Sequence, residues 1–247
     1  MHIFTRLCAL AICLGAALPA AGVDVNSNLS PLEVQDAEPA DAGSRSLDVR
    51  GRFQHTDEGK REWLLQPQLK LGLSRNMQLD LGTAIVGGQE REGRGDLSAR
   101  LLYRIREEGR DDGLPAIALS LRADFPTGVD SAGVDTDARL IMSRKLSSNG
   151  HGYANLAWMH DASARRSRRE HRYGLILGYA HSLSPRTNLV SDLVVRQKQS
   201  PGEMESIVEF GVRHALRKDT VLGAALGWGA NDDAPRYRLL FSVQQGF

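Results

Sequence analysis

Arginine, lysine and acidic residues recur at every second position in several short stretches of the sequence. They alternate with apolar residues, so in a β-strand they would share one face. The basic members are Arg50, Arg52, Lys70, Arg100, Arg104, Arg106, Arg122, Arg139, Arg213 and Arg238, and the acidic members are Asp48, Asp80, Asp124, Asp137, Asp192 and Glu209. Such a face can form a salt-bridge network or line a pore that favours anionic solutes. The intermingling of opposite charges slightly favours the network.

The histidines lack the spacing of a hydrolase site. Outer-membrane phospholipases and lipid-A deacylases place His and Ser two residues apart on one strand face, where imidazole activates the hydroxyl. None of the seven histidines here has Ser at that distance, and the adjacent His181 and Ser182 would point to opposite faces. His160 beside Asp161 could suggest an acid/base pair, but a solvated strand end explains the pair better.

Metal and cofactor chemistry is not expected. The other histidines are scattered without metal-ligand spacing, and the chain's two cysteines lie within its first 22 residues. The carboxylate pairs Asp135/Asp137 and Asp232/Asp233 fall in predicted loops, where ordinary solvation accounts for them better than weak contact with a divalent ion or lipopolysaccharide. The sequence therefore predicts no catalytic residue, no metal and no cofactor.

Residues 1–22 have the features of a secretory signal peptide. One early cation, Arg6, precedes the apolar run "LCALAICLGAAL" and the small-residue stretch "PAAG". Removal of this segment takes Cys8 and Cys13 with it and leaves a nearly neutral chain of about 225 residues, enough for a single domain. A neutral balance does not indicate a nucleic-acid partner.

After a flexible periplasmic segment predicted over residues 23–44, the apolar period is two throughout, which predicts strands and no helices. About twelve strands of roughly ten residues follow within residues 45–247. Their stretches are "SLDVRGRFQH", "WLLQPQLKLGL", "MQLDLGTAI", "LSARLLYRIR", "AIALSLRADF", "DTDARLIMSRK", "YANLAWMH", "RYGLILGYAH", "TNLVSDLVVRQ", "ESIVEFGVRH", "TVLGAALGWG" and "RYRLLFSVQQGF". The parity of "DTDARLIMSRK" and "TNLVSDLVVRQ" stays undecided, and Pro67 suggests a bulge.

This pattern predicts an all-β fold, a single transmembrane antiparallel β-barrel. Compact turns alternate with longer, more charged loops, which places both termini in the periplasm. An apolar outer face and a polar inner face suit a barrel with lipid outside and water inside. The last strand then pairs with the first, and Phe247 serves as an assembly signal for the barrel-assembly machinery.

The chain resembles the outer-membrane proteins of the meta-pathway phenol-degradation (transporter-like) family. The resemblance covers nearly all of the mature chain. It is carried by the order of "DAEP" (36–39), "LQPQLKLGLSRNMQLDLG", "ALSLRADFPTG", "LSPRTNLV" and "DAPRYRLLFSV". Gln245 departs from the apolar or aromatic residue usual near such termini. The resemblance implies movement of small molecules across the outer membrane and supplies no catalytic residues.

Two functions from different classes remain open. The first is an outer-membrane channel or facilitator for small molecules, such as aromatic or other organic compounds, with Arg100, Arg104, Arg122, Asp124, Arg139, Glu209 and Arg213 lining the lumen. The second is a non-conducting structural or surface barrel whose basic loop "ARRSRREHR" contacts lipopolysaccharide. An enzyme is a distant third. The expected partners are outer-membrane lipid, lipopolysaccharide, the assembly machinery and small solutes.

Overall fold

The structure is a computed structural model that describes residues 29–56, 59–89, 93–109, 113–129, 131–162 and 168–247. Its strands are β1 (Arg45–His55), β2 (Arg61–Ser74), β3 (Met77–Gly82), β4 (Ile85–Gly88), β5 (Gly93–Arg94), β6 (Leu97–Arg106), β7 (Ala116–Phe125), β8 (Asp135–Lys145), β9 (Gly150–His160), β10 (His171–Ser184), β11 (Thr187–Gln197), β12 (Met204–Ala215), β13 (Thr220–Gly229) and β14 (Tyr237–Gly246). Within these ranges, no helix is long and apolar enough to cross a membrane.

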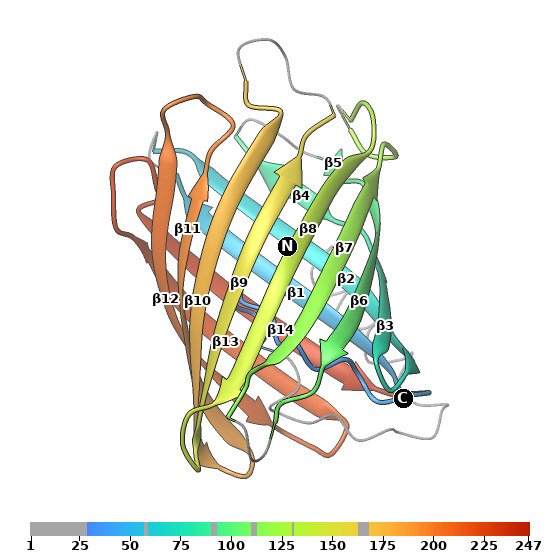
Figure 1. Cartoon of the computed structure of the whole chain (residues 1–247). Coiled ribbons are helices and arrows are strands. Elements are labelled where there is room, and N and C mark those ends of the chain that lie inside the picture. The colour runs from blue at the N-terminus through green and yellow to red at the C-terminus, as the bar shows by residue number, and fades with distance from the viewer. Residues whose placement is uncertain (1–28, 57–58, 90–92, 110–112, 130, 163–167) are drawn as a thin grey trace.

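The strands form a closed antiparallel barrel (Figure 1). Each long strand pairs with its neighbours in the chain, and β1 closes the sheet by pairing with both β2 and β14. β3 and β4 pair in succession with β2, so they act as one interrupted strand, and the wall has twelve strands within the described residues. The predicted fold class and strand number are confirmed. In Figure 1, β1 begins and β14 ends at the lower end of the barrel.

The outer face is apolar and the inner face is polar, as the period-two pattern predicts. Large apolar side chains stay exposed around the wall, among them Leu121, Leu156, Trp158, Tyr173, Phe210, Trp228 and Phe241, while Asp48, Asp80, Asn155, Glu209 and Arg213 are buried inside. A soluble barrel would show the reverse arrangement. This distribution is that of a barrel whose wall meets lipid.

The two strands of undecided parity carry apolar residues on both faces. In β8, Ile141 is buried inside while Leu140 is exposed. In β11, Val190 and Val194 are buried inside while Leu189 is exposed on the other face. Both inner faces therefore hold apolar side chains that need a partner within the lumen.

The strand paired with Pro67 is interrupted opposite this residue. Pro67 itself makes no bulge, so the predicted bulge is wrong. β2 keeps one register along β3 and β4, and the two short strands are separated by Thr83 and Ala84, opposite Pro67 and Gln66. Proline has no N–H to donate to the ladder, which explains a gap at this point. A register shift in β2 occurs instead between Gly72 and Ser74, near the turn to β3.

Residues 29–44 of the segment predicted to be flexible and periplasmic are packed inside the barrel, while residues 1–28 lie outside the described part. Leu29, Leu32, Val34 and Ala37 are buried, and the segment contacts inward-facing residues of many strands. Its composition shows no periodicity because it forms neither helix nor strand. It is held instead by irregular contacts that only the closed barrel provides.

Candidate functional site: the barrel lumen

Residues 29–44, which we call the lumen segment, rise from the lower end of the barrel and fold back inside it. Near the rim, Gly43 N donates to Gly72 O at 2.8 Å and Gly72 N donates to Ser44 O at 3.0 Å. Further in, Glu33 reaches Arg52, whereas Ser30 Oγ lies 3.0 Å from Asp48 Oδ2, nearer the start of β1. Glu33 is therefore near the turning point of a re-entrant loop.

Glu33 is the main charged anchor of the lumen segment. Its carboxylate lies 3.0 Å from Arg238 Nη1, 2.6 Å from Arg196 Nη1 and 3.7 Å from Arg52 Nη1. The three arginines come from β14, β11 and β1, so one side chain bridges distant parts of the wall. Ion pairs shielded from water in this way cost much when one partner is removed, because the other charge is left unpaired.

Polar side chains of the wall also bind the backbone of the segment. Asp192 Oδ2 accepts hydrogen bonds from the N–H groups of Glu33 and Val34, each at 3.1 Å. Asn155 forms a pair with the backbone of Gln35, with Oδ1 accepting at 2.7 Å and Nδ2 donating to the carbonyl at 2.9 Å. Nearer the rim, Gln78 Oε1 accepts from Ala40 N at 2.7 Å. These bonds satisfy a backbone that lacks its own ladder.

Apolar contacts complete the docking. The buried cluster around the lumen segment consists of Leu29, Leu32, Val34, Tyr153, Ile176, Ala180, Val190, Val194, Ile207, Ala225, Ala234 and Leu240. The fit is close at Gly178 of β10, where an added Cβ would lie 2.8 Å from both methyl carbons of Val34. The inward apolar residues of the wall thus have their partner in the lumen segment, which fills this part of the lumen.

The predicted lumen residues lie on the inner face, where most have a charged partner. Arg122 Nη2 lies 2.7 Å from Asp124 Oδ1, and Arg139 Nε lies 2.9 Å from Asp137 Oδ1. The other pairs are Arg100 with Asp80, Arg104 with Glu38 and Glu107, and Glu209 with Arg238, while Arg213 Nη2 is 3.4 Å from Gln244 Oε1. The network expected from intermingled charges is therefore present, and the lumen segment supplies Glu33 and Glu38 to it.

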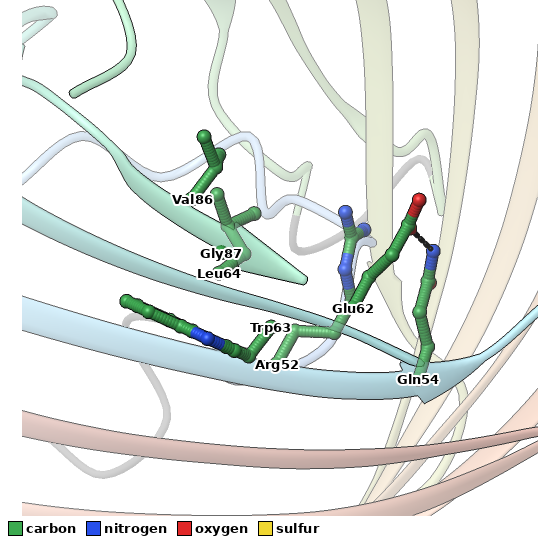
Figure 2. A pocket seen from close by; sticks show the side chains of 7 residues that line it. All are labelled: Arg52, Gln54, Glu62, Trp63, Leu64, Val86 and Gly87. Atoms are coloured by element: carbon green, nitrogen blue, oxygen red, sulfur yellow. Dashed lines mark hydrogen bonds between the residues drawn. The ribbon is translucent and has the colours of Figure 1, made fainter. Parts of the chain in front are cut away.

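A small cavity lies where the end of β1, the start of β2 and β4 meet, toward the upper end of the barrel (Figure 2). It has a volume of about 170 Å³ and is lined by Arg52, Gln54, Glu62, Trp63, Leu64, Val86 and Gly87. Gln54 Nε2 donates to Glu62 Oε2 at 2.7 Å, and Arg52 lies on the same side in Figure 2. A guanidinium beside apolar side chains suits an organic anion.

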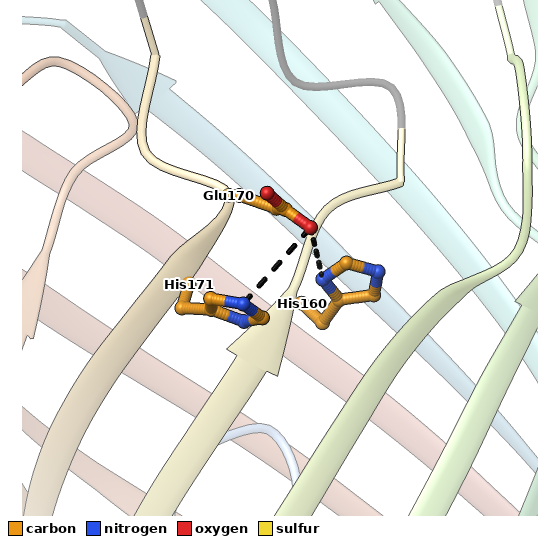
Figure 3. Close-up of side chains that lie close together, drawn as sticks. All are labelled: His160, Glu170 and His171. Carbon is orange, nitrogen blue, oxygen red and sulfur yellow. Dashed lines mark ion pairs between the residues drawn. The ribbon is translucent and has the colours of Figure 1, made fainter.

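His160, at the upper end of the barrel, has neighbours that sequence spacing did not indicate. Asp161 is buried and accepts a hydrogen bond from Gln199. His160 instead lies beside Glu170 and His171 on the outer face (Figure 3). Sequence spacing alone did not reveal this group, because it depends on the register between β9 and β10.

Comparison with known proteins finds similar structures and no similar sequence. No family model and no curated protein matches the chain. A solved structure described as the KdgM porin aligns with TM-score 0.60 and 11% identity, covering 82% of this chain and 99% of that one. The NanC porin aligns with TM-score 0.57 and 9% identity, covering 81% and 98%. A second KdgM structure, in complex with disordered oligogalacturonate, aligns with TM-score 0.57 and 11% identity, covering 82% and 99%. This chain shares their barrel fold, while the resemblance to the phenol-degradation family is not confirmed.

Proposed function

We propose that this protein is a channel or facilitator in the bacterial outer membrane that passes small organic molecules, with anions favoured. The observation that supports this proposal is a closed barrel with a lipid-facing exterior and a charged interior, in a fold shared with the KdgM and NanC porins. Both termini are then periplasmic, as the loop pattern predicts, and the upper end faces the medium. Because these relatives are described as porins, we propose passage and not catalysis as the activity.

The proposed solute class is carboxylated organic molecules, either aromatic acids or acidic sugars. The upper cavity presents Arg52 to an entering solute, next to Leu64 and Val86. One KdgM structure is described as a complex with oligogalacturonate, which is an acidic oligosaccharide. The resemblance to the phenol-degradation family points to aromatic acids. Arginines of the inner face would then favour anions over cations along the path.

Passage through this lumen also requires the lumen segment to move. Glu33 occupies the arginines that an anionic solute would otherwise meet, since it lies within 4.0 Å of Arg52, Arg196 and Arg238. We therefore propose that residues 29–44 act as a plug, held by the same charges that attract the solute. A carboxylated solute can replace Glu33 at these arginines and so favour the displaced state.

Single-channel recording in planar bilayers tests the proposal. The refolded wild-type protein should show small and infrequent current steps, and a variant lacking residues 29–40 should show larger and more frequent ones. Glu33→Gln should fall between them, because it weakens docking without removing the segment. Reversal potentials in a salt gradient should show anion preference in the deletion variant, and Arg52→Gln should reduce it.

The filled lumen favours a second candidate, a non-conducting barrel with a structural or surface role. In that case the ion pairs of Glu33, Glu209 and Arg238 serve stability alone. Contact with lipopolysaccharide through the basic residues after β9 would then be the main interaction. Folded wild-type and deletion variants that are both electrically silent, and that admit no small solutes into liposomes, would establish this alternative and refute the channel.

A further inference from the structure

The outer surface of the barrel carries two histidines and a glutamate in close contact at its upper end. His160 is the last residue of β9, His171 is the first residue of β10, and the register pairs them directly across the two strands. Glu170 precedes His171 in the chain, and Figure 3 shows its carboxylate directed at both rings. The three groups lie on the same outward face as Trp158 and Tyr173, away from the lumen.

The spacing of the three groups approaches that of ligands around one ion. Glu170 Oε1 lies 3.7 Å from His160 Nδ1 and 4.0 Å from His171 Nε2, and all three ligand atoms lie within 4.8 Å of one another. Bonds of about 2.1 Å in a tetrahedral site place neighbouring donor atoms about 3.4 Å apart. Binding therefore requires the three groups to move slightly closer together, and Glu170, whose side chain is 63% exposed, has room to do so.

One ring nitrogen of this group, His160 Nδ1, lacks a hydrogen-bond partner within the described residues and is shielded from solvent. A ring nitrogen in this state costs free energy unless something binds it. A cation placed between the three side chains would bind this nitrogen and the carboxylate together.

The rings are also held in position by their neighbour. Trp158 stacks on both imidazoles, with centroids 6.2 Å from His160 and 5.7 Å from His171, and the two imidazole centroids are 5.0 Å apart. Ligands that are fixed before the ion arrives lose little side-chain entropy on binding. The contact also places Trp158 close enough to report on an ion bound by these rings.

We propose that His160, Glu170 and His171 form a binding site for a divalent transition-metal ion of the zinc class. Two imidazole nitrogens and one carboxylate oxygen suit Zn²⁺, Cu²⁺ or Ni²⁺, whereas Ca²⁺ and Mg²⁺ prefer oxygen ligands alone. Three protein ligands leave a fourth position for water. Because the ligands come from two adjacent strands, the bound ion joins the end of β9 to the start of β10. It thereby stabilises the upper rim.

Calorimetry with ZnCl₂ tests the site. The full-length protein, refolded without a histidine tag and treated with a chelator, should bind one Zn²⁺ per barrel, and MgCl₂ should give no binding. His160→Asn, Glu170→Gln and His171→Asn should each weaken binding by at least ~tenfold. His55→Asn is the matched control, because His55 also stacks on an aromatic ring at this end and also has an unpartnered Nδ1. It should leave Zn²⁺ binding unchanged.

Fluorescence provides a readout that separates the site from a simple ion pair. In a Trp63→Phe, Trp228→Phe background, the emission of Trp158 should be quenched by Cu²⁺ and restored by a chelator, and His171→Asn should abolish the quenching. Heat-modifiable gel mobility shows that each variant is folded. Equal Zn²⁺ affinity in folded wild type and all three ligand variants would overturn the proposal. So would an absence of binding to the wild type, because both results leave only a His–Glu ion pair.

Discussion

Gln245 shows how a single polar residue fits on an otherwise apolar face. It lies on the outward parity of β14, where the resemblance suggests an apolar or aromatic residue. Its Nε2 donates to Asp219 Oδ2 at 3.1 Å, and its Oε1 accepts from Thr220 Oγ1 at 2.8 Å. A polar group with such partners is tolerated near the rim, and the two bonds join the last strand to Asp219 in the turn before β13 and to the first residue of β13.

The same hydrogen bonds act on the pKa of Asp219. Slight desolvation raises this pKa, but the hydrogen bonds from Gln245 and Thr220 outweigh it and hold the pKa below its ordinary value of 3.8. The resulting stabilisation is present above the unfolded-state pKa and is lost as the pH falls through the folded-state pKa. We therefore expect Asp219→Asn to lower the unfolding temperature slightly at neutral pH and not in strong acid. Temperature series of gel mobility measure this, and an equal loss at both pH values would contradict it.

Neighbouring residues of β7 distinguish the lipid face from the lumen face. Leu121 is 50% exposed on the outside, whereas Arg122 faces inward and pairs with Asp124. We expect Leu121→Arg to cost ~2–4 kcal/mol in refolding titrations with lipid vesicles if it lies near the bilayer midplane. Arg122→Gln is the control and should cost less, because its amide stays in the polar interior. Equal costs would mean that the outer face of β7 does not meet lipid.

At the scale of elements, the strands could be predicted from sequence and the lumen segment could not. An alternation of apolar and polar residues is a local property, and it located the wall strands. The docking of residues 29–44 depends on side chains from distant strands, such as Asn155 and Asp192. One signal was present: β11 carries Val190 and Val194 on the face opposite Leu189. Apolar residues on both faces of a barrel strand indicate that something apolar lies inside.

The close contact between β10 and the lumen segment allows the segment to be displaced without deletion. A Cβ at Gly178 would lie 2.8 Å from the methyl carbons of Val34, and a valine there would require still more space. We expect Gly178→Val to raise the open probability in bilayer recordings, because the wall is rigid and the segment must yield. The double variant with Val34→Gly restores the space and should return the current toward the wild-type level. A current unaffected by Gly178→Val would show that the segment does not control conduction.

At the scale of the whole molecule, the sequence predicted which face the lumen residues occupy but not which charges they pair with. Parity alone placed Arg100 and Arg104 inside. Their partners follow from strand register and from the lumen segment, as when Glu38 meets Arg104. Neither relation can be obtained from local spacing. The register between β9 and β10 likewise places His160 directly opposite His171, and the loop between the two strands does not by itself specify this pairing.

The orientation of the barrel in the membrane is the remaining property of the whole molecule, and it can be tested by labelling. The turns next to the termini include Lys218, and the opposite end includes Ser200, in the loop between β11 and β12. Both cysteines of the chain lie within the first 22 residues, which we expect to be cleaved, so a single introduced thiol is unique. On intact cells, a membrane-impermeant maleimide should label Ser200→Cys and should label Lys218→Cys only after the outer membrane is permeabilised. Labelling of Lys218→Cys on intact cells, with Ser200→Cys protected, would reverse the topology. It would also place the upper cavity and the His160–Glu170–His171 group on the periplasmic side.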